Sequence, residues 1–583
     1  MKFYNLTILF SKLEEKSGKL EKIDILADFF EKIKLNKDFS DLDKIIYLLQ
    51  GHLVSNIKQF PKMGIAEKMI IEALSIHSGI NKNKIKEILV KKGDIGAAAE
   101  IVLSEKKSQK SLMDFNKNFG SDMSSLEISE LYSELEKISF TSGAGSNDIK
   151  LGILRGLMKN PLETKYLLRI ITSTLRVGAA TQTILEGIAL GFTGTKENKE
   201  YIERAFNLHP DLGDIAMILA EKGIEAVKKV KIHYGIPIRM MLASRVPYTE
   251  IETKLGNPFI AEYKLDGERL QVHKKGDEIK LFSRRLLEIT ERYPDVCEIL
   301  EKSIMAKNAI LEGEVVAMDP FYEKMLPFQV LSKRRRKYDI EEMKKEVPVC
   351  LFLFDLLQFE NESFIDKSLL KRRKKLEEIV KESDELRLVK SISIKNTEEL
   401  INFFNEARER GNEGIMTKSI QPDSVYQPGN RGYLWIKLKG LEGGKLLDTV
   451  DIVLVGAFYG TGRRTGVYGT YLGAVYDSNV GNFESFTRIG SGFTDEMLNT
   501  LKELVHPLEV KNKPKNVICE DKPDVWIKPE IVVEIIGDEI TLSDKFSSLG
   551  YSMRFPVFQR IRPEKDPNDI TTTDEIKQLY ETQ

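Results

Sequence analysis

The spacing of apolar residues changes twice along the chain. From residue 1 to about residue 235, apolar residues recur at helical spacing, as in LADFFEKIKL, AEKMIIEALSI and ISELYSELEKI. This period is typical of amphipathic helices, and the alternation expected of strands is nearly absent. The segment IPIRMMLASRVP, with Pro237 and Pro247, interrupts the pattern. We therefore predict an all-α domain over residues 1–237.

Beyond this boundary, short β-branched and aromatic runs alternate with turns. FIAEYKL, ERLQVHKK, AILEGEVVAMD and PVCLFLFDLLQF have the composition of strands, whereas LLKRRKKLEEIVKE has a helical period. Gly276 and Asp277 separate two strand-like runs, which predicts a hairpin. The paired glycines of LKGLEGGKLLD mark a second boundary. Residues 238–441 are therefore predicted to form an α+β domain.

Residues 442–583 are dominated by strand patterns. VDIVLVGAFYG, TYLGAVYD, ESFTRIGSGF and IVVEIIGDEI lie in this region. About five strands in roughly 110 residues is the size and content of a small β-barrel of the oligonucleotide-binding (OB) type. The predicted fold is therefore multidomain: an all-α domain, an α+β domain and a C-terminal OB-fold β-barrel.

Composition narrows the class of protein. A chain of 583 residues is expected to form about three domains of roughly 100–200 residues each. With 42% hydrophobic and 30% charged residues, the chain lacks the composition of a disordered protein. Lys+Arg (88) balance Asp+Glu (89), but local clustering of basic groups, not net charge, decides nucleic-acid binding.

The cysteines and the N-terminal segment indicate a cellular compartment. Cys297, Cys350 and Cys519 lie far apart, which excludes a disulfide framework or a cysteine-rich zinc site and fits a reducing cytoplasm. The apolar start FYNLTILF runs into charged residues without a cleavage site, so it predicts a core helix and not a signal peptide. No later segment is long and apolar enough to span a membrane. We expect a cytoplasmic, monomeric protein without a membrane partner.

Lys264 stands out because of its neighbours. In AEYKLDGERLQVH it is followed by Asp266, Gly267 and Arg269. A lysine can act as a nucleophile when desolvation or nearby positive charge eases the loss of its proton, and a glycine lets the backbone approach a ligand closely. By chance, Lys-x-Asp-Gly is expected in about one chain in ten of this length. Taken alone, it fits a surface lysine before a turn better than a nucleophile.

Five further segments reverse that interpretation. After EYKLDGER (262–269), the chain presents in order SRR (283–285), LEGE (311–314), FD (354–355), EGIMTK (413–418) and WIKLK (435–439). In this order the segments resemble the motifs of the covalent nucleotidyltransferases, which include ATP-dependent ligases and mRNA capping enzymes. With its helical first region, the chain is most similar to the replicative ATP-dependent DNA ligases of archaea and eukaryotes, over essentially its whole length.

The resemblance implies a DNA ligase that seals nicks in duplex DNA during replication, repair and recombination. Lys264 would attack the α-phosphorus of ATP and form a lysine–AMP phosphoramidate. AMP would then pass to the 5′-phosphate of the nick, and the 3′-hydroxyl would displace it. The implied partners are ATP, Mg²⁺ with Mn²⁺ as an alternative ion, and nicked duplex DNA. The resemblance implies that residues 1–237 form a helical DNA-binding domain, residues 238–441 an adenylation domain and residues 442–583 an OB-fold domain.

Cations suit the phosphates in such a site, because phosphoryl transfer builds charge on oxygens that cations stabilise. Lys437 and Lys439 alternate along a strand and share one face, so both can meet the α-phosphate. Lys418 and Arg431 supply further positive charge nearby.

Carboxylates suit the metal. Glu314 and Glu413 are hard oxygen ligands of the kind that Mg²⁺ uses. Glu312 and Glu314 alternate on a strand and point the same way, so one of them could be structural. The resemblance favours Glu314 as the ligand.

The resemblance assigns the remaining nucleotide-binding residues. Phe354 would stack on adenine, and Glu262 would accept a hydrogen bond from the adenine amino group. Arg269 and Arg284 would hold the ribose and the phosphate of the nick. Phe354 taken alone is better explained as a core residue, and the motif context reverses this. Nothing in Glu262 or Phe354 separates ATP from ADP, GTP or NAD, although the lack of a cysteine zinc site disfavours the NAD-dependent type.

Three further basic segments lie outside the motifs described so far. The runs KRRRK (333–337) and KRRKK (371–375) are interpreted as solvated helix faces, and no DNA contacts are assigned to them. The segment RFPVFQRIRPEKD (554–566) resembles the last nucleotidyltransferase motif, which orients pyrophosphate when the C-terminal domain closes over the site. It departs from the usual ligase form at Val557 and Glu564. The implied pyrophosphate and closure residues are Arg554, Arg560, Arg562 and Lys565.

The helical region is expected to grip duplex DNA. TSGAGSNDIK (141–150) and RVGAATQTILEG (176–187) offer glycine-flanked turns and helix N-termini, which present backbone N–H groups to phosphates. Helix capping and tight packing explain any single one of these residues equally well. Gly143 and Arg176 are the contact candidates.

The stretch SQKSLMDF (108–115) has the spacing of a sliding-clamp peptide. Gln109, Leu112 and Phe115 would share one side of a single 3₁₀ turn. Because the stretch lies in a Ser/Lys-rich connector, we favour clamp binding over core packing.

Two rival functions share parts of this pattern. An RNA ligase or capping-type nucleotidyltransferase has the same motifs but lacks the helical domain. A non-catalytic DNA or sliding-clamp scaffold could retain an inactive core. The intact set Lys264, Glu314, Glu413, Lys437 and Lys439 argues against the second rival.

Overall fold

The computed structural model describes residues 1–583 apart from positions 56, 59–60, 62, 109–124, 176, 336–339, 439–448, 479, 544–546 and 582–583. The chain divides into two compact units. Unit 1 comprises Met1–Met63, Ser125–Phe140 and Val177–Leu441. Unit 2 comprises Gly64–Ser124, Thr141–Arg176 and Glu442–Gln583. The N-terminal helices therefore contribute to both units.

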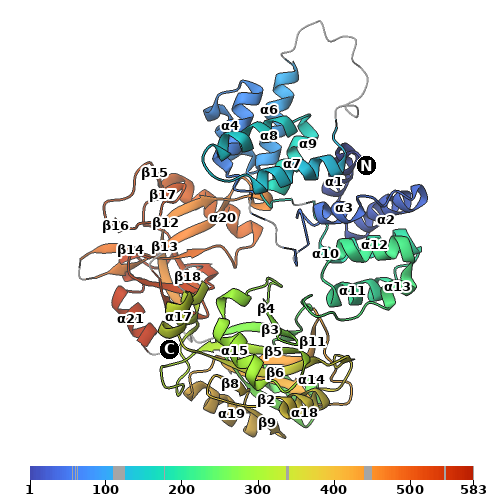
Figure 1. Ribbon diagram of the computed structural model, residues 1–583. Coiled ribbons are helices and arrows are strands. Elements are labelled where there is room, and N and C mark those ends of the chain that lie inside the picture. The colour runs from blue at the N-terminus through green and yellow to red at the C-terminus, as the bar shows by residue number, and fades with distance from the viewer. Residues whose placement is uncertain are drawn as a thin grey trace. The chain divides into compact units, whose positions relative to one another are not determined.

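The N-terminal part of unit 1 is helical, as predicted. FYNLTILF lies in the first helix, whose buried face includes Leu6, Phe10 and Leu13. The second helix packs closely on α10, since a Cβ atom at Gly191 of α10 would lie only 2.7 Å from the Cβ of Phe30. The helices of this part, labelled in Figure 1, are α1 (Phe3–Glu15), α2 (Lys19–Asn36), α3 (Leu42–Leu49), α7 (Ile128–Phe140), α10 (Thr181–Thr193), α11 (Lys199–Leu208), α12 (Leu212–Lys222) and α13 (Ile224–Lys228).

Two sheets form the rest of unit 1. The first sheet has the order β1-β11-β10-β2-β9, and the second has β4-β3-β5-β6-β7, with β8 also paired to β6. In the first sheet lie β1 (Leu242–Ser244), β2 (Phe259–Lys264), β9 (Ser391–Ile394), β10 (Gly414–Ser419) and β11 (Arg431–Leu438). In the second lie β3 (Glu268–Lys275), β4 (Glu278–Ser283), β5 (Asn308–Ala317), β6 (Val349–Phe359), β7 (Glu362–Ser363) and β8 (Leu386–Leu388).

The sequence pattern explains these strands. The predicted hairpin is confirmed, because Lys275 pairs with Glu278 across a turn in which Gly276 has φ of 60°. The two sheets share one apolar core, which includes Phe259 of β2 and Val316 of β5. The accompanying helices are α14 (Ile251–Leu255), α15 (Pro294–Ser303), α16 (Phe328–Ser332), α17 (Ile340–Glu346), α18 (Leu369–Ile379) and α19 (Thr397–Glu409).

Unit 2 joins five N-terminal helices to the strand-rich C-terminal region. Its helix α9 begins where the sequence signals it: Pro161 is the first helical residue, and the side chain of Asn160 accepts a hydrogen bond from the backbone N–H of Glu163. The helices of unit 2 are α4 (Glu67–Ser78), α5 (Lys82–Lys92), α6 (Ile95–Ser108), α8 (Ser146–Leu157), α9 (Pro161–Ile171), α20 (Asp495–Val505) and α21 (Thr573–Glu581).

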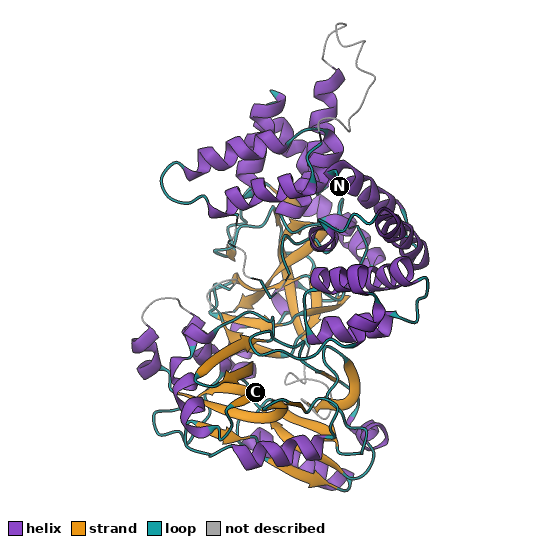
Figure 2. Cartoon of the chain, turned by 45° about the vertical axis from the view of Figure 1, so that its right-hand side comes forward, coloured by secondary structure: helices purple, strands orange, loops and turns teal. Residues whose placement is uncertain are grey.

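The C-terminal region is strand-rich, as predicted. Its main sheet has the order β15-β17-β12-β13-β14-β16, with β18 paired to β12 and β21. Figure 2 shows the strands of the molecule in orange. Those of the C-terminal region are β12 (Val450–Tyr459), β13 (Tyr468–Asp477), β14 (Asn482–Ile489), β15 (Glu509–Val510), β16 (Val517–Ile518), β17 (Val525–Ile527), β18 (Val532–Ile536), β19 (Glu539–Leu542), β20 (Tyr551–Arg554) and β21 (Val557–Ile561). The expectation of about five strands was too low because β15, β16, β17, β19 and β20, with two to four residues each, are too short to show a clear alternation.

Membrane insertion finds no support in the part of the chain that is described. There, no helix has both the length and the apolarity needed to cross a bilayer.

Candidate active site

Strand pairing places Lys264 beside Glu413. Lys264 is the last residue of β2 and lies opposite Gly414, the first residue of β10. The backbone N–H of Glu413 donates to the carbonyl oxygen of Lys264 at 3.0 Å, and the Glu413 carboxylate forms an ion pair with the Lys264 ammonium group. Two motifs that are far apart in the sequence therefore meet at the ends of two adjacent inner strands of one sheet.

Glu314 approaches the same point from the other sheet. It lies on β5, opposite Arg269 of β3. Burial raises the pKa of the Glu314 carboxyl group to about 7. The positive charges of Lys264 and Arg269 lower this pKa, and the negative charge of Glu413 raises it further. Gly267 makes the close approach feasible, because a Cβ atom there would lie 2.8 Å from the Cγ of Glu314.

Glu312, two residues earlier, has a different environment. It is fully buried, and its carboxylate accepts hydrogen bonds from Arg269 Nη2 at 2.6 Å and Tyr426 Oη at 2.9 Å. Gln271 Nε2 lies at 3.3 Å from the same carboxylate. Because these donors occupy it, Glu312 has a structural role, and Glu314 is the carboxylate that faces Lys264.

Arg269 connects this charged end to an aromatic end. Its Nη1 donates to the carbonyl oxygen of Met241 at 2.8 Å, and its guanidinium carbon lies 5.3 Å from the centroid of Phe354 and 5.4 Å from that of Trp435. Its Nε is buried and has no hydrogen-bond partner among the described residues. A buried donor of this kind is normally satisfied, so it fits a ligand acceptor such as a ribose hydroxyl.

Glu262 closes the aromatic end. Phe354 of β6 packs edge-to-face against Trp435 of β11, with ring centroids 6.1 Å apart. The ammonium group of Lys418 lies 4.8 Å from the Phe354 centroid and forms an ion pair with Glu262 at 2.6 Å. Glu262 and Lys418 are both buried. The pocket therefore has an aromatic wall beside a buried carboxylate.

The basic residues expected to bind the phosphates do not all lie at one place. Lys437 shares its strand face with Trp435 and lies opposite Met416 of β10. Arg431 is exposed at the start of β11, six residues from Lys437, which corresponds to about 20 Å along a strand. Arg284 is exposed in the turn after β4. The structure thus brings Lys437 close to the site motifs and leaves Arg431 farther along its strand. Arg284 directly follows Ser283, which pairs with Leu270 next to Arg269. Lys439 lies outside the described residues.

In unit 2, the four residues expected to bind pyrophosphate are paired with carboxylates of the same region. Arg562 is the most engaged, with Nη1 at 3.0 Å from Asp451 and at 2.9 Å from Glu534. The other pairs are Arg554 with Glu539 at 2.5 Å, Arg560 with Glu534 at 3.0 Å and Lys565 with Asp451 at 2.6 Å.

The run KRRKK (371–375) corrects the sequence interpretation. Lys371 and Lys374 are exposed, but Arg372 is fully buried in an ion pair with Asp355 at 2.7 Å, and Arg373 reaches Glu262. Arg372 follows Leu369 by three positions and precedes Leu376 by four, which places it on the inward face of α18. That helical spacing was the signal that sequence reasoning missed.

In KRRRK (333–337), Lys333 is exposed, but Arg334 is buried and donates to Asp295 at 2.7 Å. The interpretation as a solvated face is therefore wrong for Arg334 too.

The expected DNA and clamp contacts are only partly described. Gly143 is exposed, with φ of 91°, in the turn before α8. Arg176, Gln109, Leu112 and Phe115 lie outside the described residues.

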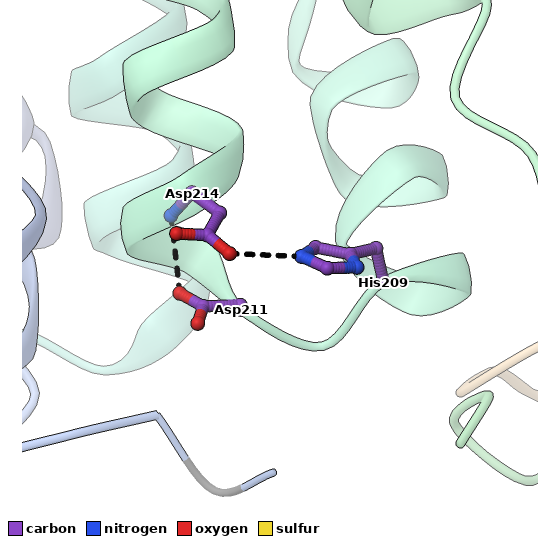
Figure 3. A group of neighbouring side chains, drawn as sticks. All are labelled: His209, Asp211 and Asp214. Carbon is purple, nitrogen blue, oxygen red and sulfur yellow. Dashed lines mark hydrogen bonds and ion pairs between the residues drawn. The ribbon is translucent and has the colours of Figure 1, made fainter. Parts of the chain in front are cut away.

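His209, Asp211 and Asp214 form another cluster of metal-ligating types (Figure 3). Asp211 caps α12 by accepting from the backbone N–H of Asp214 at 3.0 Å, and His209 Nε2 lies 3.2 Å from Asp214. The Lys58 ammonium group already lies 2.9 Å from Asp211 and 3.6 Å from Asp214. Because a lysine supplies the positive charge, this cluster is a helix cap with its counter-ion and not a metal site.

Comparisons with known proteins agree with the motifs. Residues 2–189 match the family model for the DNA ligase N terminus, residues 240–439 the model for the ATP dependent DNA ligase domain, and residues 464–565 the model for the ATP dependent DNA ligase C terminal region. The match to the N-terminal model argues against an RNA ligase or capping enzyme, which would lack this region.

Relatives match over the whole length. The chain is 42% identical over 595 residues to a DNA ligase of Acidianus ambivalens and 43% identical over 594 residues to one of Saccharolobus solfataricus, covering 100% of this chain and 98% of each relative. A solved structure called "Pmar-Lig_Pre." shares the fold, with a TM-score of 0.59 and 18% identity over 96% of this chain and 99% of that chain. The chain therefore belongs to the family of ATP-dependent DNA ligases.

Proposed function

We propose that the pocket around Lys264 carries out the ATP-consuming first step of nick sealing. The observation that supports it most is the meeting of Lys264, Glu413 and partly buried Glu314 at one point, reached from three separate segments. A reactive amine, a carboxylate in contact with it and a second carboxylate of raised pKa are the groups that nucleophilic phosphoryl transfer needs.

In the proposed sequence, the Nζ atom of Lys264 forms a bond to the α-phosphorus of ATP, and the bond from that phosphorus to pyrophosphate breaks. The proton of Nζ leaves to the Glu413 carboxylate, which is already in contact with it. An oxygen of the 5′-phosphate at the nick then attacks the same phosphorus, and Lys264 leaves as its Nζ takes a proton back from Glu413. Finally the 3′-hydroxyl attacks the 5′-phosphorus and loses its proton to water, and AMP leaves.

Glu314 and Glu413 fit a divalent cation. The structure places two carboxylates near each other, and burial with like charge raises the pKa of Glu314 to about 7. A hard cation would relieve this repulsion and suits oxygen donors, which favours Mg²⁺, with Mn²⁺ as an alternative ion. When bound, the ion supplies charge neutralisation for the phosphates.

Arg269, Phe354 and Glu262 are proposed to hold the nucleoside. The unpartnered Nε of Arg269 fits a ribose hydroxyl, the ring of Phe354 fits the face of adenine, and the carboxylate of Glu262 fits its amino group. The proposed phosphate contacts are Lys437, Lys439, Arg431 and Arg284, and the proposed pyrophosphate contacts are Arg554, Arg560, Arg562 and Lys565.

The partners are proposals of the same kind. We assign nicked duplex DNA to the helical region, with Gly143 and Arg176 as contact candidates, and a sliding clamp to Gln109, Leu112 and Phe115. The exposed left-handed turn at Gly143 supports the first assignment. The second rests on sequence spacing alone, as do a monomeric state and a cytoplasmic location.

The experiment is nick sealing with a duplex that carries a 5′-phosphate at a single break, in the presence of ATP and Mg²⁺. The protein is expected to join the DNA strand, and Lys264→Ala is expected to abolish joining. A matched duplex with an RNA strand at the break tests the substrate. Preferential joining of RNA, or full activity of Lys264→Ala, would contradict the proposal.

A further inference from the structure

Glu262 lies between two cations from different elements. Its Oε1 accepts a hydrogen bond from Nη1 of Arg373 on α18 at 2.9 Å, and its Oε2 lies 2.6 Å from Nζ of Lys418 on β10. The side chains of Glu262 and Lys418 are 3% and 2% exposed, and that of Arg373 is 13% exposed. Because charge-assisted bonds away from water are short and directional, this carboxylate has little freedom to turn.

The guanidinium group of Arg373 is itself fixed. Its Nε donates to Oε1 of Glu377 at 3.0 Å, and its Nη2 donates to the carbonyl oxygen of Val389 at 2.7 Å. The planar donor set thus has an acceptor on each nitrogen, two of them outside the pocket. Arg373 is therefore a rigid support for Glu262.

The supported carboxylate adjoins the aromatic wall. Lys418, which holds the other oxygen of Glu262, lies 4.8 Å from the centroid of Phe354 and 4.5 Å from that of Trp435. A carboxylate oxygen accepts more than one hydrogen bond, so each oxygen of Glu262 retains capacity for a ligand donor. An ionised carboxylate accepts hydrogen bonds and cannot donate one. It can therefore bind an amino group on the edge of a base, but it cannot form a hydrogen bond with an oxo group at the same position.

We infer that Arg373 is a positioning residue that sets the selectivity for the base of the nucleotide. It holds Glu262 so that the carboxylate accepts from the 6-amino group of adenine and disfavours the 6-oxo group of guanine. This inference rests on the proposed adenine contact of Glu262. The hydrogen bonds of Arg373 go to Glu262, Glu377 and Val389 and not to Lys264, so we expect its effect on nucleotide binding and not on the chemical step.

The test measures the rate of protein self-adenylation against nucleotide concentration for ATP and for purine riboside 5′-triphosphate, which lacks the 6-amino group. Arg373→Ala is expected to raise the KM for ATP about tenfold, the scale of one charge-assisted hydrogen bond, with the maximal rate within about twofold. The KM for the analogue stays unchanged. Arg373→Lys restores part of the ATP affinity, because a single donor still reaches Glu262.

Lys371→Ala is the matched control. It removes one positive charge from the same helix at an exposed position and is expected to change neither KM. Thermal melting of each variant reports whether the fold is retained.

Equal losses with both nucleotides, or a loss in maximal rate alone, would show a general structural role and overturn the inference, as would an unchanged KM for ATP. Glu262→Gln distinguishes a failure of the proposed adenine contact from a failure of the role of Arg373. If Glu262→Gln changes the ratio of the two KM values and Arg373→Ala does not, only the role of Arg373 is wrong. If Glu262→Gln leaves that ratio unchanged, the proposed adenine contact is wrong and the inference falls with it.

Discussion

The two compact units both contain networks of paired charges, but water reaches them to different extents. In unit 1, the side chains of Asp355 and Arg372 are both 0% exposed. In unit 2, the side chain of Arg560 is 56% exposed beside Glu534, and that of Lys565 is 32% exposed beside Asp451. The pair in unit 1 is shielded from water on both sides, whereas in unit 2 the cations of these two pairs are partly open to water.

This difference in exposure matches a difference in task. A buried pair is costly to separate, so it keeps its geometry and can support a binding pocket. An exposed pair contributes about 0–1 kcal/mol, so its cation can exchange a carboxylate for another anion, such as pyrophosphate, at little cost. The buried pair is therefore suited to hold a binding site in shape, whereas Arg560 and Lys565, two of the residues proposed to meet pyrophosphate, can exchange their partners at little cost.

The largest expected effect is on the buried pair. Asp355→Ala leaves the Arg372 guanidinium buried without its counter-ion, which should lower the free energy of unfolding by about 3–5 kcal/mol. Chemical denaturation monitored by near-ultraviolet signals measures it. The control is Asp366→Ala, whose side chain is 75% exposed. A loss no greater than that of the control would break the contrast between the units.

The next effect depends on pH. The pKa of Glu314 is raised by burial to about 7 from 4.5, so the folded protein binds this proton more tightly than the unfolded chain. Ionisation of Glu314 therefore lowers the free energy of unfolding. This loss grows between pH 4.5 and pH 7 and is constant at about 3 kcal/mol above pH 7.

Glu314→Gln removes this cost. In metal-free buffer, the variant is expected to be more stable than the wild type by about 3 kcal/mol at pH 8 and equally stable below pH 4.5. Denaturation at the two pH values measures the difference. Equal stability at pH 8 would show that the pocket is not strained by this charge.

A smaller effect is expected from Arg562, the most closely paired of the cations proposed to meet pyrophosphate. Arg562→Ala should slow self-adenylation about tenfold, because a cation that meets pyrophosphate is lost. Joining of a nick that is already adenylated should remain within about twofold, since that reaction involves no pyrophosphate. Arg488→Ala, which breaks a pair with Asp521 in the same region, is the control. Equal losses in both reactions would contradict a role in pyrophosphate binding.

The smallest effect is expected on stability in unit 2. Arg560→Ala breaks exposed pairs with Glu534 and Glu564, so the free energy of unfolding should change by less than about 1 kcal/mol. A loss comparable to that of Asp355→Ala would remove the distinction between the two networks.

The sequence predicted the fold regions for a physical reason, and it named the candidates of the proposed site from the order of their motifs. Helical spacing and strand alternation are local, so the three regions were visible without a structure. Lys264, Glu314, Glu413 and Phe354 were found because their motifs keep a fixed order. Their meeting depends on strand pairing, which residue spacing alone does not reveal.

The rest depended on tertiary contacts. The composition of KRRKK did not reveal that Arg372 and Arg373 point inward, because a buried arginine and a solvated arginine are the same letter in a sequence. The division of labour between Glu312 and Glu314 was open in the sequence, since both face the same way from one strand. The donors Arg269 and Tyr426 decide it, and Tyr426 lies in a different segment.

The central claim is that Lys264 becomes covalently attached to AMP. The direct measurement is the intact mass of the protein after incubation with ATP and Mg²⁺ in the absence of DNA, followed by peptide mapping, with Lys264→Ala beside it. The account predicts a gain of one AMP, located on Lys264 and absent from the variant. No adduct on folded protein that was not adenylated beforehand, or an adduct on another residue, would contradict it.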